Sequence, residues 1–308
     1  MRPLIVIAGP TGSGKSDLAL RLAERLGGEI VNYDSVQIYR GFDIGSAKPS
    51  LESRAIVPHH LFDIVDAVDE FNAADYARAA REVVQAIDAR GHRSILAGGT
   101  FFYLRALLAG LPEMPGRDEP VRARLRAIAD RPRGAARLHR WLSKIDPQSG
   151  RKIAPADRHR VERALEVYVA SGRPISNWRS PTATSEDELP ALKIGLQIDR
   201  KRLVEILDQR VDAMYRAGLV EETRALLERW PRGARPFGTI GYKEAAAVIA
   251  GESSIPDAIA ETMRRTRAYA KRQMTWLRAE RGMHWLDAST LRENSLCEAA
   301  LRLIEELT

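Results

Sequence analysis

Near its N-terminus the chain reads Leu4-Ile5-Val6-Ile7-Ala8-Gly9-Pro10-Thr11-Gly12-Ser13-Gly14-Lys15-Ser16. The last eight residues form a complete G-x-x-x-x-G-K-[ST] phosphate loop, preceded by an apolar run and followed by leucines at helical spacing. A buried strand delivers the chain into such a loop, so that backbone N–H groups and a helix N-terminus point at phosphate oxygens. Lys15 supplies a mobile positive charge, and the Ser16 hydroxyl can ligate Mg²⁺. The stretch therefore predicts a diphosphate or triphosphate site over residues 9–16.

Such a loop is the signature of nucleotide-binding proteins, most of them ATP-binding, yet the remaining equipment for nucleotide hydrolysis is weak. A nucleotide-hydrolysing protein normally carries an Asp at the end of a later apolar strand, where it helps to hold Mg²⁺. Here the best later strand, Ser94-Ile95-Leu96-Ala97, runs directly into Gly98-Gly99-Thr100 without an acid. There is also no Asn-Lys-x-Asp segment of the kind that binds guanine. This mismatch favours a reaction in which the bound phosphates are the leaving group over one in which nucleotide hydrolysis supplies energy.

Composition narrows the class of protein. A chain of 308 residues with 44% apolar and 29% charged residues suits one large domain or a core with a second lobe, and argues against disorder. The single Cys297 excludes a disulfide framework and suits a reducing cytosol, and the six histidines show no metal-ligand spacing. No apolar run approaches the ~20 residues needed to span a bilayer, and the N-terminal run is too short for a signal peptide. We expect a cytoplasmic protein with no membrane segment.

Positive charge is concentrated in one segment. The whole chain carries 48 Lys+Arg and 41 Asp+Glu, or +7. Residues 117–179 hold 16 basic and 7 acidic residues, or +9, which leaves 32 basic and 34 acidic residues, or −2, elsewhere. A surplus of this kind is what a polyanion-binding lobe needs. A solvated Arg-rich face is the alternative.

The order of the expected elements indicates an α/β fold. Strands are predicted at 4–8, 29–31, 94–97 and 192–198, and helices at about 15–26, 72–90 and 101–109. This alternation predicts a parallel, doubly wound sheet of the P-loop NTPase-like class, with helices dominating from residue 201 onward.

A second lobe is expected within this fold. Pro112, Pro115 and Gly116 interrupt the chain before a mostly helical stretch, and residues 178–185 have the composition of a loop. The expected core is residues 1–112 and 190–308, and the expected insertion is a helical, basic, RNA-binding lobe of residues 113–189.

Three polar segments are candidate parts of the site. Asp34 and Thr100 each follow a predicted strand, and residues just past the carboxyl ends of parallel strands line the ligand crevice. A turn or helix-capping role is the alternative for both residues. The segment Pro58-His59-His60-Leu61-Phe62-Asp63 can order a loop over the site or serve a purely structural role.

Eight segments of the chain form a recognisable series: the phosphate loop, Asp34-Ser35-x-Gln37-x-Tyr39, Gly45-Ser46-Ala47-Lys48-Pro49, Pro58-His59-His60-Leu61, Gly98-Gly99-Thr100-x-x-Tyr103, Arg160-x-x-Arg163-Ala164-Leu165-Glu166, Gly241-Tyr242-Lys243-Glu244 and Lys271-Arg272-Gln273-x-Thr275-Trp276-Leu277-Arg278. In these segments and their order the chain resembles the tRNA dimethylallyltransferases, which prenylate the adenine just 3′ of the anticodon. Two positions depart from the family pattern, because His159 stands where a Gln is expected and Ser46 where Thr is usual. The C-terminal zinc finger of eukaryotic relatives is also missing, as the lone cysteine requires.

The resemblance implies a reaction without nucleotide hydrolysis, which agrees with the absence of an Asp after the predicted strand 94–97. The phosphate loop would hold the diphosphate of dimethylallyl diphosphate, with Mg²⁺ at Ser16, and no nucleotide would be consumed. Asp34 matches the family's base and Thr100 a hydroxyl that orients the amine. Lys15 and Arg210 would neutralise the departing diphosphate. The partners implied are this diphosphate and the anticodon stem-loop of tRNA, and we expect a monomer.

The resemblance also implies a set of RNA contacts, because the target adenine must be flipped out of its stack to reach a buried base. The implied tRNA-binding residues are Asp34, Ser35, Val36, Gln37, Thr100, Arg122, His159, Arg160, Arg163, Gly241, Tyr242, Lys243, Lys271, Arg272, Gln273, Trp276 and Arg278. Helical spacing places residues 264, 267, 271 and 278 on one cationic face. Trp276 is either a core residue or a platform for stacking.

Two other classes of protein share parts of this pattern. A small-molecule or nucleotide kinase shares the strand, phosphate loop and helix, but it needs ATP turnover and an acidic Mg²⁺ partner. A non-catalytic RNA-binding nucleotide protein has no need of Asp34.

Overall fold

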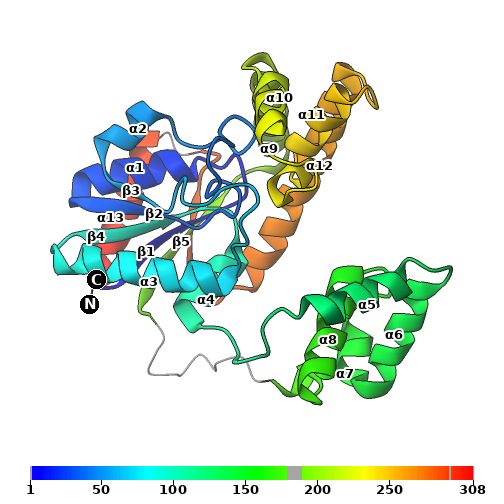
Figure 1. Cartoon of the computed structure of the whole chain (residues 1–308). Helices are drawn as coiled ribbons and strands as arrows, with labels where there is room; N and C mark the ends of the chain where they lie inside the picture. The colour runs from blue at the N-terminus through cyan, green and yellow to red at the C-terminus, as the bar shows by residue number, and fades with distance from the viewer. Residues whose placement is uncertain (1, 179–188, 291–292, 308) are drawn as a thin grey trace. The chain divides into compact units, whose positions relative to one another are not determined.

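A computed structural model of the chain describes residues 2–178, 189–290 and 293–307. Within these ranges six strands form one parallel sheet in the order β3-β2-β4-β1-β5-β6 (Figure 1). The strands are β1 (Leu4–Ala8), β2 (Gly28–Asn32), β3 (His59–His60), β4 (Arg93–Ala97), β5 (Ala191–Gln197) and β6 (Met283–Asp287). The predicted α/β class with a P-loop NTPase-like parallel sheet is confirmed.

Helices make up most of the remaining described chain. They are α1 (Lys15–Leu26), α2 (Leu51–Ile56), α3 (Ala73–Ala89), α4 (Phe101–Ala109), α5 (Glu119–Ala129), α6 (Gly134–Ile145), α7 (Pro147–Lys152), α8 (Arg158–Ser171), α9 (Arg200–Arg216), α10 (Leu219–Arg229), α11 (Tyr242–Ile249), α12 (Ile255–Ala279) and α13 (Glu293–Leu307), with 3₁₀ turns η1 (Ile175–Asn177) and η2 (Arg235–Gly238). None of these helices, in the part of the chain that the structure describes, is both long and apolar enough to cross a membrane.

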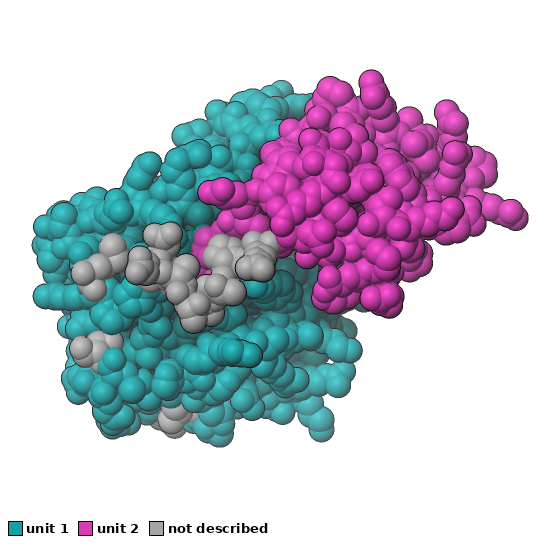
Figure 2. Space-filling model, turned by 90° about the horizontal axis from the view of Figure 1, so that it is seen from below, with its two compact units in different colours: residues 1–108, 189–308 teal, residues 109–188 magenta. Residues whose placement is uncertain are grey.

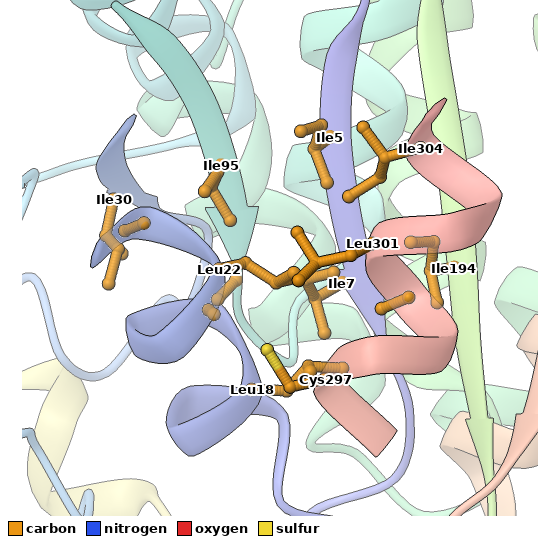
Figure 3. Packing of buried hydrophobic residues seen from close by; sticks show 14 of the residues in the cluster. Ile5, Ile7, Leu18, Leu22, Ile30, Ile95, Ile194, Cys297, Leu301 and Ile304 are labelled. Atoms are coloured by element: carbon orange, nitrogen blue, oxygen red, sulfur yellow. The ribbon is translucent and has the colours of Figure 1, made fainter. Parts of the chain in front are cut away.

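The main core lies between the sheet and two helices that are far apart in sequence. Alternate residues of β1, Ile5 and Ile7, point toward α1 and α13, where Leu22 and Leu301 meet them (Figure 3). All five residues of β1 are buried, which shows that both faces of the strand are covered. Strands covered on both faces have the continuous apolar sequence seen here, and this is why β1 is predictable.

Helices dominate the described residues from 201 onward, as expected, but a strand that the sequence analysis did not predict lies among them. Met283–Asp287 forms β6, which pairs in parallel with β5 at the edge of the sheet. Its residues are only partly buried or exposed, so the strand lacks the apolar run that marks β1. Trp285 lies opposite Gly195, and the absence of a side chain there lets the indole approach.

The chain divides into two compact units, coloured separately in Figure 2. Unit 1 comprises residues 1–108 and 189–308 and contains the sheet, whereas unit 2 comprises residues 109–188. Unit 2 consists of α5–α8 with η1 around its own apolar core, in which Leu125, Leu142 and Leu165 are buried. Of the loop predicted over residues 178–185, all but Trp178 lies outside the described residues.

Candidate active site

The phosphate loop joins β1 to α1 inside unit 1. Gly14 lies at the N-cap of α1 with φ +82°, a left-handed conformation that favours glycine, and its carbonyl accepts the amide hydrogen bond of Leu18. The Lys15 ammonium donates to the carbonyl of Pro10 at 2.8 Å and thus lies over its own loop. Ser16 is exposed in the first turn of α1. The loop therefore presents a helix N-terminus, an ammonium and a hydroxyl together.

Asp34 follows the end of β2 and has two distinct carboxylate oxygens. Oδ1 accepts a hydrogen bond from the Val36 amide at 2.9 Å, and the Asp34 amide donates to Asn32 Oδ1 at 2.8 Å. Oδ2 lies toward Gly99, since a Cβ added to that glycine would come within 2.9 Å of it. Asp34 therefore does have the turn role that was the alternative interpretation of the sequence. Only Oδ1 takes part in the turn, and Oδ2 points toward Gly99.

Thr100 connects the turn after β4 to the turn after β2. Its hydroxyl accepts from the Ser35 amide at 2.9 Å and donates to Ser35 Oγ at 3.0 Å. Its main-chain amide donates to the carbonyl of Tyr33 at 3.1 Å. The hydroxyl is thus engaged by Ser35, and this contact fixes the segment that carries Asp34.

Two residues of α12 complete this part of the site. The Gln273 side chain is 3% exposed, accepts from the Thr11 amide at 2.8 Å and donates to the carbonyl of Gly99 at 3.0 Å. The Tyr269 hydroxyl donates to the same carbonyl at 3.1 Å. A helix late in the sequence therefore ties the phosphate loop to the turn after β4.

Two hollows meet at this point in unit 1. The smaller one, of about 100 Å³, lies beside the phosphate loop, and Lys15, Ser16, Asp34 and Arg210 are among its lining residues. The larger one, of about 330 Å³, has a more apolar lining that includes Val36, Val211, Met214 and Ile240. The two share the residues Thr11, Asp34, Ser46, Arg210 and Tyr269. An anionic group in the first hollow and a largely apolar or aromatic group in the second would meet beside Asp34.

Burial shifts the pKa values of the charged groups in this place. Burial, helped by the charge of Arg210 and opposed by that of Asp34, lowers the pKa of Lys15 to about 7. Burial raises the pKa of Asp34, against the hydrogen bonds from the Val36 and Gln37 amides and the charges of Lys15 and Arg210. Its raised pKa makes the Asp34 carboxylate a better proton acceptor. The positive charges of Lys15 and Arg210 favour binding of an anion beside it.

Other predicted residues of unit 1 hold the walls of these hollows. Gln37 Nε2 donates to the carbonyls of Ser46 and Ala47 at 3.0 and 3.1 Å. Tyr242 is fully buried, and its hydroxyl donates to Glu222 and accepts from the Gly45 amide. These contacts anchor the loop around Ser46. Next to Tyr242, Gly241 is buried and lines the larger hollow, and Lys243 is exposed.

The cationic face predicted on α12 is partly neutralised. Arg264 pairs with Glu261 at 2.6 Å and Arg267 with Asp208 at 2.5 Å. Further along, Lys271, Arg272 and Arg278 are exposed, and the Arg272 guanidinium lies 5.8 Å from the centre of the Tyr269 ring. Trp276 is 46% exposed, so it is not a core residue.

The predicted residues of unit 2 fall into two groups. Arg122 and Arg163 both bind the fully buried carboxylate of Glu166, at 2.8 Å each. His159 and Arg160 are exposed at the start of α8, and Arg160 pairs with Asp157 at 2.9 Å. The first pair is therefore committed to the interior of the unit.

Sequence reasoning missed several residues of the site. It did not assign Tyr269 to the site, and it did not identify the second hollow with Met214, Thr262 and Arg265. One usable signal was present, because Tyr269 and Gln273 are four residues apart and so share a helix face. Among the described residues, no group of three or more His, Cys, Asp or Glu side chains is placed to hold a metal ion.

The fold and site together define a phosphate-loop α/β protein with a carboxylate beside the loop. The family model described as IPP transferase matches residues 37–280. The tRNA dimethylallyltransferase of Geobacter sulfurreducens is 45% identical over 92% of this chain and 91% of its own length, and that of Solibacter usitatus is 48% identical over 97% and 98%. The solved tRNA isopentenylpyrophosphate transferase of Bacillus halodurans superposes with a TM-score of 0.73 at 35% identity, covering 100% of this chain and 97% of that one.

The chain belongs to the tRNA dimethylallyltransferase family of prenyl-transferring enzymes, which confirms the predicted resemblance.

Proposed function

We propose that this protein transfers a dimethylallyl group from dimethylallyl diphosphate to the N6 amine of the adenine 3′-adjacent to the anticodon in certain tRNAs, and releases diphosphate. The observation that carries the proposal is the meeting of the two hollows at Asp34. The smaller hollow offers the diphosphate a helix N-terminus and the cations Lys15 and Arg210. The larger hollow offers space for a flipped base or an allyl group beside the same carboxylate.

The chemistry assigned to each residue follows from its position. The allylic C–O bond breaks, a C–N bond forms to the adenine, and the amine loses a proton. Asp34 Oδ2 takes that proton, since Oδ1 is held in the turn. Lys15 and Arg210 stabilise the charge that builds up on the departing diphosphate. Thr100 lines neither hollow and would act as a positioning residue, because its hydroxyl holds the Asp34–Ser35 segment through its contacts with Ser35.

The residues present fit a Mg²⁺ ion held largely by its substrate. Ser16 offers one hydroxyl at the wall of the smaller hollow, and protein Mg²⁺ sites often combine one or two side chains with phosphate oxygens and water. When bound, the ion would neutralise diphosphate charge. Ser16 is the residue proposed to hold it.

RNA binding is assigned to exposed residues of both units. Lys271, Arg272 and Arg278 of α12 supply charge for phosphates, and exposed Trp276 supplies a stacking surface. The remaining family positions, including Ser35, Val36, Gln37, Gly241, Tyr242 and Lys243, would shape or border the entrance. We further propose that the protein is a monomer and that it acts in the cytoplasm, where tRNA, its proposed substrate, is found.

The test is a transfer assay with the purified protein, labelled dimethylallyl diphosphate and bulk tRNA. The expected result is label in N6-modified adenosine and equimolar diphosphate, with no ATP consumed. Transcripts with adenine or guanine at the position 3′ of the anticodon serve as matched substrates, and only the first should accept label. Absence of transfer to any tRNA, or hydrolysis of ATP at a comparable rate, would exclude the proposal and favour a kinase.

A further inference from the structure

Unit 2 contains more cations than its acids can neutralise. The seven acidic residues of 117–179 are all engaged in the described structure: Glu119, Asp130, Asp157, Glu162 and Glu166 pair with arginines, and Asp118 and Asp146 accept hydrogen bonds from main-chain amides. Six arginines are used in these pairs, namely Arg117, Arg122, Arg126, Arg158, Arg160 and Arg163. The charge left over must lie elsewhere in the unit.

Part of this charge forms a line along α6. Arg133, Arg137, Arg140 and Lys144 are exposed and have no acidic partner among the described residues of unit 2. Arg137, Arg140 and Lys144 lie within about 60° of the circumference of α6 over about 10 Å, and Arg133 is the N-cap residue that precedes the helix. The sequence of α6 contains no acid at all. We call these four residues the α6 stripe.

The opposite side of α6 explains why the stripe faces outward. Leu138 and Leu142 are buried in the core of unit 2, and His139 Nε2 lies 2.8 Å from the carbonyl of Ile153. These contacts fix the rotation of the helix about its axis. The helix therefore holds the side of α6 that carries Arg137, Arg140 and Lys144 away from the core of unit 2.

We propose that the α6 stripe is the main phosphate-binding surface of unit 2 and that its partner is the backbone of base-paired RNA. This inference rests on the proposed function and refines it. Arg122 and Arg163 were expected to contact RNA, but both are engaged with Glu166, so other cations of the unit are better placed to bind phosphates. The stripe has regularly spaced charges and no exposed aromatic side chain, whereas surfaces for single strands normally include aromatic platforms. Duplex RNA is recognised largely through its shape and its backbone.

The test compares two variants that lose equal charge. The α6 variant is Arg137→Gln, Arg140→Gln, Lys144→Gln. The control is Arg25→Gln, Arg78→Gln, Arg232→Gln, three exposed arginines of unit 1 that have acidic partners. For tRNA binding we expect the α6 variant to lower the log–log salt slope by about 3 and to weaken affinity by on the order of 10² at 0.15 M salt. The control should stay near wild type in both the salt slope and the affinity.

A second variant guards against misfolding. Arg133 has φ +61°, which glycine adopts freely, so Arg133→Gly removes one charge while relaxing the backbone. Its salt slope should fall by about 1 with no loss of thermal stability. A loop-free RNA duplex should bind the wild type and lose affinity for the α6 variant.

Three results would overturn the inference. They are an unchanged slope in the α6 variant, an equal loss in the control, or a loss confined to single-stranded RNA. Failure of the proposed function is distinguishable, because it would appear in the wild type as absent transfer whatever the duplex binding shows.

Discussion

Gln273→Met removes the two hydrogen bonds that the Gln273 side chain makes to the site while keeping a side chain of similar length. The Thr11 amide loses its acceptor at 2.8 Å, whereas the carbonyl of Gly99 keeps the Tyr269 hydroxyl at 3.1 Å. A buried donor left without a partner costs about 1–3 kcal/mol, and a lost bond whose acceptor stays bonded costs about 0.5–1.5 kcal/mol. The free energy of unfolding should therefore fall by roughly 2–4 kcal/mol.

Two measurements follow from this value. For a unit of this length the loss corresponds to a Tm lower by roughly 5–15 °C. The Kd for dimethylallyl diphosphate, measured well below the Tm, should rise because the Thr11 amide is no longer held in the phosphate loop. The affinity for tRNA should stay near wild type, since Gln273 is almost fully buried.

Lys271→Met is the matched control, because it places the same residue two positions earlier on the same helix at an exposed site. It should leave Tm and diphosphate binding unchanged and weaken tRNA binding. The reasoning is refuted if Gln273→Met behaves like this control, since Gln273 would then act as an RNA contact and not as a link between α12 and the phosphate loop.

Asp34→Asn keeps an oxygen for the turn, so the fold and the tRNA affinity should persist. The kcat should fall by ~10²–10⁴, as loss of a general base predicts. If single-turnover kinetics show the wild-type rate, Asp34 has only its role in the turn. With the pKa of Lys15 at about 7, its ammonium loses its proton as pH rises through that value, so the Kd for dimethylallyl diphosphate should increase above pH 7. Lys15→Met should bind weakly and without this dependence, and parallel profiles for the two proteins would contradict the assignment. Buried Glu29 loses solvation, but its hydrogen bonds with Arg90, His60 and His92 outweigh that and lower its pKa to about 2. Its stabilising contribution is thus present above the unfolded pKa of about 4.5 and is lost as pH falls toward 2. Glu29→Gln should cost roughly 2 kcal/mol at pH 7 and little at pH 2 in urea unfolding, whereas a constant difference at both pH values would exclude the ionised carboxylate as the cause.

Some parts of the fold and site were determined locally and were therefore predictable. The segment from Leu4 to Ser16 has an apolar strand, glycines and a helix start in immediate succession, and each is favoured by its own residues. Asp34 lines the hollow beside the phosphate loop, and Thr100 contacts the neighbouring Ser35, because the carboxyl ends of parallel strands meet at one edge of a sheet. The eight ordered segments further identified the family.

Other features depend on residues far apart in the chain. The β6 strand is partly exposed and gains its hydrogen bonds only from β5, so no local pattern marks it. The second hollow exists because α9, α12 and residues 238–241 before α11 approach the turn after β2.

The sequence alone established a phosphate loop, a parallel sheet, a basic segment and the family, because motif, periodicity and net charge are properties of neighbouring residues. Only the tertiary structure decided which side chains are free to act. It buried Gln273 against Thr11 and Gly99, exposed Trp276, and used Arg122 and Arg163 to neutralise Glu166. The physical reason is that a charge or hydrogen-bonding group is available to a ligand only when no other part of the folded chain already satisfies it.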